Sequence, residues 1–483
     1  MNDHKPKAIV LITTDEQRQD TLGIYGCEAI QTPHIDRIGE QGTCFDNAYV
    51  VSPWCLPSRC SMLTGCYPHT HGAYSNFSNG LLKHDQPNLY KSAREAGYHT
   101  AHFGKCHYEP VRYGMFSADE TAISPETRDY YLSLGIDHLE LQDDKNVSIW
   151  QYDDYSRALD EAGFLSDYRK EAWNKNSGGV FTFPGPKEWH PDCWVGEKAK
   201  TYVDEWNQDN DLFMWVSFSG PHYPIDPPEE YLDRVDMDKL PPMVFKEGEW
   251  TDEQRIHYGS FHGGGGIDGC GYSERNACGD YDDAYWKRMR QHYMANMALI
   301  DDQVGAVVKS LEEKFGENVL IVFTADHGDM LGNHRLWGKN NCGYDEVLKI
   351  PFLMRKPGDD GRNGRVSERI QSIDIFPTLR AAMDLPPVPV DGAIIENVVQ
   401  RGGYEYTLAE GENFYCISDG RYKLIRVRIP SREDSVYELY DLENDPMCYE
   451  NRYSDLESQR IIDRLQSAVL NDEIVDTLFG QSH

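Results

Sequence analysis

The eleven residues from Cys55 to Gly65 combine a thiol with basic and hydroxyl groups at a spacing that could do chemistry. They read Cys-Leu-Pro-Ser-Arg-Cys-Ser-Met-Leu-Thr-Gly, which is an improbable pattern to obtain by chance. A structural interpretation is a turn followed by a helix, with Cys55 as a small buried residue, as is common for free cysteine. The alternative, that Cys55 takes part in chemistry, depends on partners elsewhere in the chain.

Acidic residues follow two apolar runs that are far apart in the chain. Asp15 and Glu16 come after the first apolar run, and Asp326 with His327 comes after a later one. Either pair alone could be acidic caps of helices. Carboxylate oxygens suit calcium or magnesium, and a single histidine shifts the preference slightly toward softer ions. Together with the Cys55 motif they predict a divalent metal site, with Ca²⁺ favoured over Mg²⁺ or Mn²⁺.

Cationic side chains that could bind an anion occur at three further places. Lys105 and His107 are two residues apart, so on an extended segment both side chains project to the same side. His222 follows a proline after an apolar run, and Lys339 lies downstream of the second acidic pair. Taken singly, each lysine could be a solvated surface charge and each histidine a structural residue. Weaker candidates for lining the same pocket are Asn76 and His334.

Apolar runs of strand length alternate with helical segments over most of the chain. Strands are predicted at 8–12, 98–103, 212–218 and 319–323, and a long helix at about 281–314. Strands separated by helices indicate a large, mostly parallel α/β sheet with helices on both faces. Such sheets place their chemistry beyond the carboxyl ends of the strands, where most of the candidate residues lie.

The pattern changes after residue 385. Short strands are predicted at 404–409, 414–418, 422–428 and 436–441, followed by an amphipathic helix at 456–470. We therefore predict a catalytic α/β domain of residues 1–385 and a smaller C-terminal antiparallel-sheet subdomain of residues 386–483. Two excursions, 109–190 and the glycine-rich 259–279, are interpreted as loops that form pocket walls.

Composition limits the possible partners. With 483 residues, 40% of them hydrophobic, the chain can bury a large core. The net charge of −33 argues against nucleic acid or an anionic membrane as partner, and requires that any anion site be built from local positive charge. No apolar stretch is long enough for a membrane helix. Because residues 1–7 lead into a strand without a cleavage-site pattern, we expect a cytoplasmic protein.

The Cys55 motif resembles the modification signature of the type I sulfatases, whose leading cysteine is oxidised to formylglycine. Other elements typical of that family occur along the chain in the same order as in the family. The similarity runs from about residue 8 to 452. They are Asp15-Glu16, Thr32-Pro33-His34-Ile35-Asp36, Gly104-Lys105-Cys106-His107, Pro221-His222-Tyr223-Pro224, Asp326-His327-Gly328, Lys339, Asp374-Ile375-Phe376-Pro377-Thr378, Tyr422-Lys423-Leu424-Ile425 and Glu438-Leu439-Tyr440-Asp441. The chain departs from the family at Glu16, where Asp or Gln is usual.

This resemblance implies an alkaline-phosphatase-like fold and a site at which the hydrate of formylglycine 55 attacks sulfur. Arg59 would steady the hydrate, because its planar guanidinium can bind oxygens in pairs. Lys105 and Lys339 would bind the sulfate. His222 would protonate the leaving alkoxide, and His107 would deprotonate the second hydroxyl of the hydrate and expel sulfate. The metal ligands implied are Asp15, Glu16, Cys55 as formylglycine, Asp326 and His327.

The resemblance predicts a metal-dependent sulfatase acting on a small anionic sulfate ester, with a formylglycine-generating maturation enzyme as a partner. A phosphonate monoester or phosphodiester hydrolase of the same fold is the alternative, and Lys105 with His107 favours the sulfatase. A non-catalytic anion-binding protein is disfavoured because Cys55, Arg59 and Asp326 are all present. Among substrates, sulfated saccharides are preferred over choline or aryl sulfates, because tryptophan and tyrosine in the predicted loops could stack on sugar rings.

Overall fold

The computed structural model describes residues 5–76, 82, 86–109, 125–145, 152–172, 174, 179–262, 278–339, 341–361, 364–428 and 435–470. Its largest sheet has eight strands in the order β10-β2-β9-β7-β1-β6-β4-β5. From one edge to the other these are Gly364–Val366, Thr43–Phe45, Phe352–Arg355, Val319–Ala325, Ala8–Asp15, Asp211–Pro221, Tyr98–Gly104 and His138–Leu141. Strands β7, β1, β6, β4 and β5 are mutually parallel, whereas β9 runs antiparallel to both of its neighbours. The predicted fold class is confirmed.

Strand β1 is the central strand, and its sequence explains that position. All eight of its residues are buried, as expected for a continuous apolar run in a parallel sheet covered on both faces. Its register pairs Thr14 with Ala325 on one side and Asp15 with Pro221 on the other. The carboxyl ends of β1, β6 and β7 therefore lie together at one edge of the sheet.

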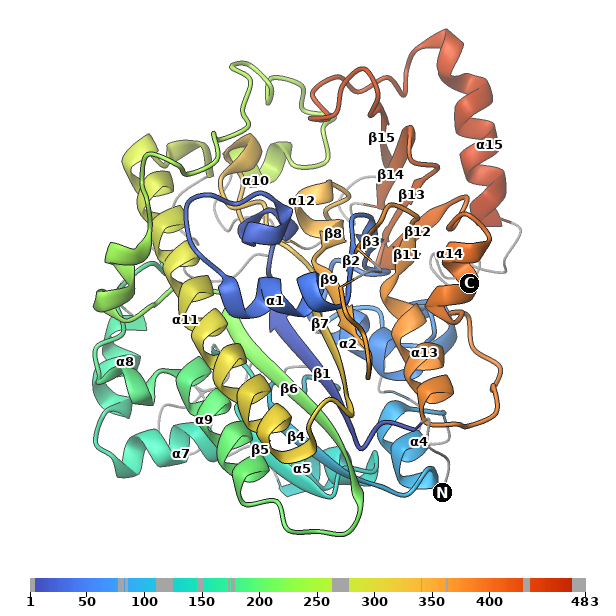
Figure 1. Ribbon diagram of the computed structural model, residues 1–483. Coiled ribbons are helices and arrows are strands. Elements are labelled where there is room, and N and C mark those ends of the chain that lie inside the picture. The colour runs from blue at the N-terminus through green and yellow to red at the C-terminus, as the bar shows by residue number, and fades with distance from the viewer. Residues whose placement is uncertain are drawn as a thin grey trace.

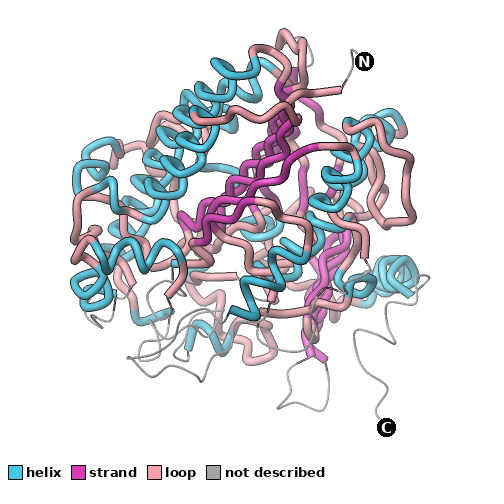
Figure 2. The backbone as a smooth tube through the Cα atoms, turned by 90° about the horizontal axis from the view of Figure 1, so that it is seen from below, coloured by secondary structure: helices cyan, strands magenta, loops and turns pink. Residues whose placement is uncertain are grey.

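Helices cover both faces of this sheet: in Figure 2 the helices, drawn in cyan, lie on either side of the magenta strands. On one face α11 (Asp283–Phe315) packs against α9 (Pro191–Asp204) and α1 (Pro33–Gln41). On the other, α13 (Ile375–Ala382) packs against α2 (Cys55–Thr64) and α4 (Leu89–Glu95) (Figure 1). Further short helices are α3 (Pro68–His71), α10 (Tyr258–His262), α12 (Asp345–Leu348) and α14 (Ile395–Gln400).

Helix α11 also fixes the start of α1 through a buried carboxylate. The backbone N–H groups of His34 and Ile35 donate to Oδ1 of Asp301 at 3.1 and 2.7 Å. The first N–H groups of a helix have no partner within the helix, so an acceptor from another element satisfies them. Burial raises the pKa of Asp301 to about 7, although these N–H donors act in the opposite direction.

The C-terminal region forms an antiparallel sheet of β12 (Thr407–Gly411), β13 (Phe414–Ser418), β14 (Tyr422–Arg428) and β15 (Ser435–Asp441). Alternate residues face opposite sides. Phe414 and Cys416 join the main core, whereas Tyr415 and Ile417 pack under α15 (Gln459–Leu470). A small sheet of β11 (Ile370–Gln371), β3 (Ala48–Tyr49) and β8 (Lys349–Ile350) lies beside it (Figure 1).

The segment 109–190, interpreted from sequence as a loop, is largely ordered structure where it is described. It supplies the edge strand β5 together with α5 (Pro125–Ser133), α7 (Asp154–Glu161) and α8 (Leu165–Ala172). Strand β5 has only four residues, His-Leu-Glu-Leu, which is too short for a clear periodic signal. Residues 263–277 of the other predicted loop lie outside the described residues. Across the described chain, none of the helices is both long and apolar enough to cross a membrane.

Candidate active site

Cys55 is the first residue of α2 and lies against the carboxyl ends of the central strands. The N–H of Leu56, in the first turn of α2, donates to Oδ1 of Asn76 at 3.0 Å, which anchors the start of the helix. Gly65 ends the helix with a φ of 72°, and a Cβ there would lie 2.9 Å from the Phe376 ring, so glycine is required. All ten residues of α2 are buried. The contact that the structure gives Asn76 is with this backbone.

Four buried side chains surround the thiol with atoms that could bind a metal ion. Asp15, Cys55, Asp326 and His327 place one donor atom each within 4.8 Å of one another. His327 Nε2 lies 3.1 Å from the Cys55 sulfur and 3.6 Å from a carboxylate oxygen of each aspartate. His327 Nδ1 lies 2.9 Å from the Gly328 carbonyl, which can only accept, so Nδ1 carries the hydrogen. The lone pair of Nε2 therefore faces the cluster, as in a metal-binding histidine.

The charges of this cluster favour a cation at its centre. Burial and the neighbouring Asp15 raise the pKa of Asp326 to about 7, because two carboxylates face each other away from water. Burial and the same aspartate raise the pKa of the Cys55 thiol to about 12. A divalent ion between the carboxylates would remove their repulsion. The four donors are therefore chemically suited to a metal ion, and their oxygen-rich composition fits calcium or magnesium.

Arg59 lies one turn after Cys55 on α2 and is completely buried. Its Nε donates to Oδ2 of Asp326 at 2.8 Å, and one terminal nitrogen donates to the Ser217 hydroxyl at 2.7 Å and to the Lys105 carbonyl at 3.0 Å. These bonds join α2, β7, β6 and the end of β4 around one guanidinium. Arg59 is thus fixed beside the four-residue cluster that includes the thiol.

Lys105 follows β4 and is buried between two carboxylates. Its ammonium contacts Oδ2 of Asp15 and Oδ2 of Asp144. Burial alone would raise the pKa of Asp144, but Lys105 and then His222 hold it below its ordinary value. His107 is 3% exposed, and neither of its ring nitrogens has a hydrogen-bond partner in the described part of the chain. Its imidazole is therefore available to a bound substrate.

His222, Lys339 and Glu16 form a second charged group at the same edge of the sheet. Oε2 of Glu16 lies 3.4 Å from Nε2 of His222 and 3.3 Å from the ammonium of Lys339. Nδ1 of His222 donates to the Tyr223 carbonyl at 2.5 Å. Burial and the Lys339 charge lower the pKa of His222 to about 3, so its ring is neutral near pH 7 before a substrate anion binds. The structure thus places Glu16 beside the cationic groups and outside the four-residue cluster.

The contacts of His334 are with other residues than these groups. Its Nδ1 bonds to Oε1 of Glu249, and its ring stacks on Tyr344 with centroids 4.9 Å apart. It has a φ of 57° within an irregular turn, so its direction could not be read from the sequence. Sequence reasoning missed Asp144, which lies beyond β5. The only available signal was an Asp-Asp-Lys run after a very short apolar pattern.

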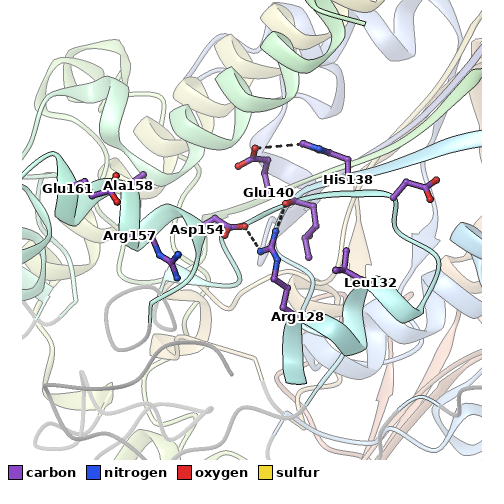
Figure 3. A pocket seen from close by; sticks show the side chains of 10 residues that line it. Arg128, Leu132, His138, Glu140, Asp154, Arg157, Ala158 and Glu161 are labelled. Atoms are coloured by element: carbon purple, nitrogen blue, oxygen red, sulfur yellow. Dashed lines mark hydrogen bonds and ion pairs between the residues drawn. The ribbon is translucent and has the colours of Figure 1, made fainter. Parts of the chain in front are cut away.

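A cavity of about 510 Å³ lies elsewhere, along the outer edge of β5 (Figure 3). Its lining residues are Arg128, Leu132, Asp137, His138, Leu139, Glu140, Asp154, Arg157, Ala158 and Glu161. Arg128 contacts Asp154 at 2.7 Å and the Leu139 carbonyl at 3.0 Å, which covers polar backbone of the edge strand. None of the candidate catalytic residues lines this cavity. We therefore interpret it as a gap between the edge strand β5 and the helices that pack over it, and not as the active site.

Comparisons with known proteins identify the family of the chain. The model of the family described as Sulfatase matches residues 7–385, and a model described as N-sulphoglucosamine sulphohydrolase, C-terminal, matches residues 332–474. An arylsulfatase of Clostridium perfringens is 27% identical over 479 residues, covering 96% of this chain and 94% of that protein. An N-acetylglucosamine-6-O-sulfatase of Bacteroides thetaiotaomicron is 25% identical, covering 93% and 83%.

Solved structures share the fold. The phosphonate monoester hydrolase of Agrobacterium radiobacter superposes with a TM-score of 0.77 at 21% identity, covering 97% of this chain and 95% of that one. At this identity the likeness establishes the architecture alone.

Proposed function

The chain belongs to the sulfatase family of sulfuric ester hydrolases, and we propose that it removes sulfate from a sulfated saccharide through a formylglycine formed from Cys55. The observation that carries this proposal is the position of Cys55. Cys55 is the first residue of a fully buried helix, and Arg59 follows it by one turn. The Cys55 sulfur lies 3.7 Å from Oδ1 of Asp15 and 3.1 Å from Nε2 of His327. A residue so placed can present an oxygen to a sulfur atom held beyond the strand ends.

The thiol itself is a poor candidate for the nucleophile. Only a thiolate attacks efficiently, and burial with Asp15 raises the pKa of Cys55 to about 12. Oxidation of the side chain to an aldehyde removes this obstacle, because the hydrate of an aldehyde offers two hydroxyl oxygens. One can form the bond to sulfur, and the other can lose its proton to expel sulfate and restore the aldehyde.

Charge balance supports a metal ion as part of the working site. With all carboxylates ionised, the four acidic side chains that contact the site outnumber its three cations by one. The acids are Asp15, Glu16, Asp144 and Asp326, and the cations are Arg59, Lys105 and Lys339. A divalent ion held by Asp15, Cys55 as formylglycine, Asp326 and His327 would make the site positive and would withdraw charge from the sulfuryl oxygens. We propose calcium, with magnesium or manganese as alternatives.

The remaining residues have roles that follow from their contacts. Lys105 and Lys339 bind the sulfate oxygens, each held in place by a carboxylate. His222 serves the leaving oxygen. Its Nδ1 carries a hydrogen that it donates to the Tyr223 carbonyl. Nε2 is therefore the nitrogen that gains a proton once the anion has entered and then donates it to the leaving oxygen. His107, with both ring nitrogens unpartnered in the described structure, accepts the proton of the second hydroxyl.

The saccharide assignment draws on the relatives. One relative, matched over 83% of its own length, is named an N-acetylglucosamine-6-O-sulfatase, and the family model that matches the C-terminal region is described as N-sulphoglucosamine sulphohydrolase, C-terminal. The alternative is a phosphonate monoester hydrolase, the activity named for the structure with a TM-score of 0.77. We favour the sulfate ester because Lys105 and His107 together match the sulfatase pattern.

The test has two parts. Mass spectrometry of the peptide that contains residue 55 should show conversion of the thiol to an aldehyde, and an unmodified thiol in active native protein would refute the mechanism. A panel of sulfated mono- and disaccharides, choline sulfate, an aryl sulfate and a phosphonate monoester should then give the highest kcat/KM for a sulfated sugar. A preference for the phosphonate monoester would support the alternative.

A further inference from the structure

Three consecutive side chains after β5 each hold a different segment of the site. Oδ1 of Asp143 accepts the N–H groups of Cys106 and His107 at 3.0 and 2.8 Å. Asp144 contacts the Lys105 ammonium. Lys145 donates to Asp226 at 2.7 Å, just beyond the turn that carries His222. All three are buried, so the turn beyond β5 is built into the site.

The Asp143 and Lys145 bonds leave Asp144 little freedom. Asp143 also donates its backbone N–H to Asp153 at 3.0 Å and accepts the Tyr131 hydroxyl at 2.9 Å. Lys145 donates to Asn296 at 2.7 Å as well as to Asp226. Because both neighbours are anchored, the backbone of Asp144 is fixed in place, and the contact with Lys105 holds its side chain. The Asp144 carboxylate is therefore aimed at Lys105 before any substrate arrives.

Asp144 is also the carboxylate that Lys105 does not share with the metal cluster. Asp15 contacts the same ammonium but belongs to the group formed with Cys55, Asp326 and His327. A cation at that group would compete with Lys105 for Asp15. The Asp144 carboxylate lies outside the group, so it remains available as the counter-ion of Lys105.

A second metal site is a poor explanation for these residues. Asp15, Asp144 and His222 do place donor atoms within 4.8 Å of one another. However, the Lys105 ammonium already contacts both carboxylates. The His222 nitrogen nearest Asp144 is Nδ1, at 4.0 Å, and its hydrogen points to the Tyr223 carbonyl. An ammonium thus takes the place that a cation would need.

We propose that Asp144 is a positioning residue that fixes the ammonium of Lys105 where the sulfate oxygens bind. This inference rests on the proposed function, since it assigns Asp144 to the sulfate-binding step. Without the carboxylate, Lys105 keeps its charge but turns toward Asp15. The sulfate then meets a cation that is displaced and partly neutralised by a metal ligand.

A double-mutant cycle tests the proposal. Asp144→Asn should lower kcat/KM about 10- to 100-fold, the range found when a partner that orients a metal ligand is removed. In a Lys105→Ala background, the same substitution should cost less than about twofold, because the group it positions is gone. Equal losses in both backgrounds would overturn the proposal. Asp144→Glu, which keeps the charge, should recover part of the activity lost by Asp144→Asn.

The matched control is Asp137→Asn, at the opposite end of β5. Its carboxylate accepts the N–H and the hydroxyl of Thr100 at 3.0 and 2.9 Å, away from the site. This variant should keep its kcat/KM while its thermal stability falls. A comparable loss of activity would show that any disturbance of β5 suffices, which would also overturn the assignment of Asp144.

Binding of inorganic sulfate, measured by calorimetry with metal present, gives a readout that needs no turnover. Asp144→Asn should weaken sulfate binding about tenfold relative to the unsubstituted protein, and unchanged affinity would refute the positioning role. Activity with an unmodified residue 55, or no sulfatase activity once residue 55 is converted to the aldehyde, would instead refute the proposed function. The two failures are therefore distinguishable.

Discussion

Replacement of Cys55 should separate the loss of catalysis from the loss of stability. The side chain is 1% exposed, and its sulfur lies 3.1 Å from His327 and 3.7 Å from Asp15. Cys55→Ala removes one buried atom, comparable to one methylene, which corresponds to about 1 kcal/mol of folding free energy. Loss of a nucleophile, in contrast, lowers turnover by at least about 10⁴-fold in enzymes that depend on one.

Cys60 provides the matched control. It lies on the same helix, is 0% exposed, and burial raises the pKa of its thiol as well. Cys60→Ala should therefore cost a similar free energy of unfolding in urea, about 1 kcal/mol, yet leave kcat almost unchanged. The two variants would then agree in stability and differ in turnover by several orders of magnitude.

Cys55→Ser addresses the chemistry directly. Serine supplies one hydroxyl but cannot form an aldehyde hydrate, so it has no second hydroxyl with which to expel sulfate. We expect turnover as low as in Cys55→Ala, with a sulfated serine peptide detectable by mass spectrometry after incubation with substrate. Near-normal steady-state turnover by the serine variant would refute the formylglycine reasoning.

Asp326→Asn should weaken metal binding at least about tenfold, because it removes a charged oxygen ligand; an unchanged metal affinity, from chelator titrations followed by thermal unfolding, would contradict the proposed cluster. His222→Ala should slow hydrolysis of alkyl or sugar sulfates far more than that of an activated aryl sulfate, whereas Lys339→Ala should slow both similarly. Values of kcat/KM on a substrate pair differing in leaving-group pKa decide this, and equal slowing by His222→Ala would remove its acid role. Asp301→Asn concerns stability. Burial raises the pKa of Asp301 to about 7 from an ordinary value of about 3.9, so the folded state binds more protons in that window and stability falls as pH rises through it. The Tm of the unsubstituted protein should therefore fall relative to that of Asp301→Asn between pH 4 and 7; a constant difference would contradict the pKa.

The sheet was predictable because its strands are buried on both faces. Runs such as the one that begins at Ala8 are apolar throughout, and the helices between them leave a parallel sheet as the simplest arrangement. Once the strands are parallel, their carboxyl ends must meet. Asp15, Lys105, His222 and Asp326, spread over more than half of the chain, are thereby brought together without any local sequence signal linking them.

The unpredicted features depend on backbone geometry that short sequence patterns do not encode. Glu16 has a φ of 66°, which turns its side chain toward His222 and Lys339. His334, also left-handed, turns toward Glu249. In both cases the direction of the side chain is set by a left-handed backbone conformation, which a residue with a β-carbon rarely adopts.

The strongly acidic composition does not prevent binding of the proposed anionic substrate, because the charges around the site are buried. Among the described residues, most of the acidic side chains are exposed or only partly buried, and salt screens the fields of such charges over about 8 Å at physiological ionic strength. Arg59, Lys105 and Lys339 are each at most 1% exposed, and a metal ion held among Asp15, Asp326 and His327 would be equally buried. Charges in such surroundings interact far more strongly than charges at the surface. A bound sulfate would therefore experience chiefly the few buried charges around it, and a single divalent ion would suffice to change their sum from negative to positive.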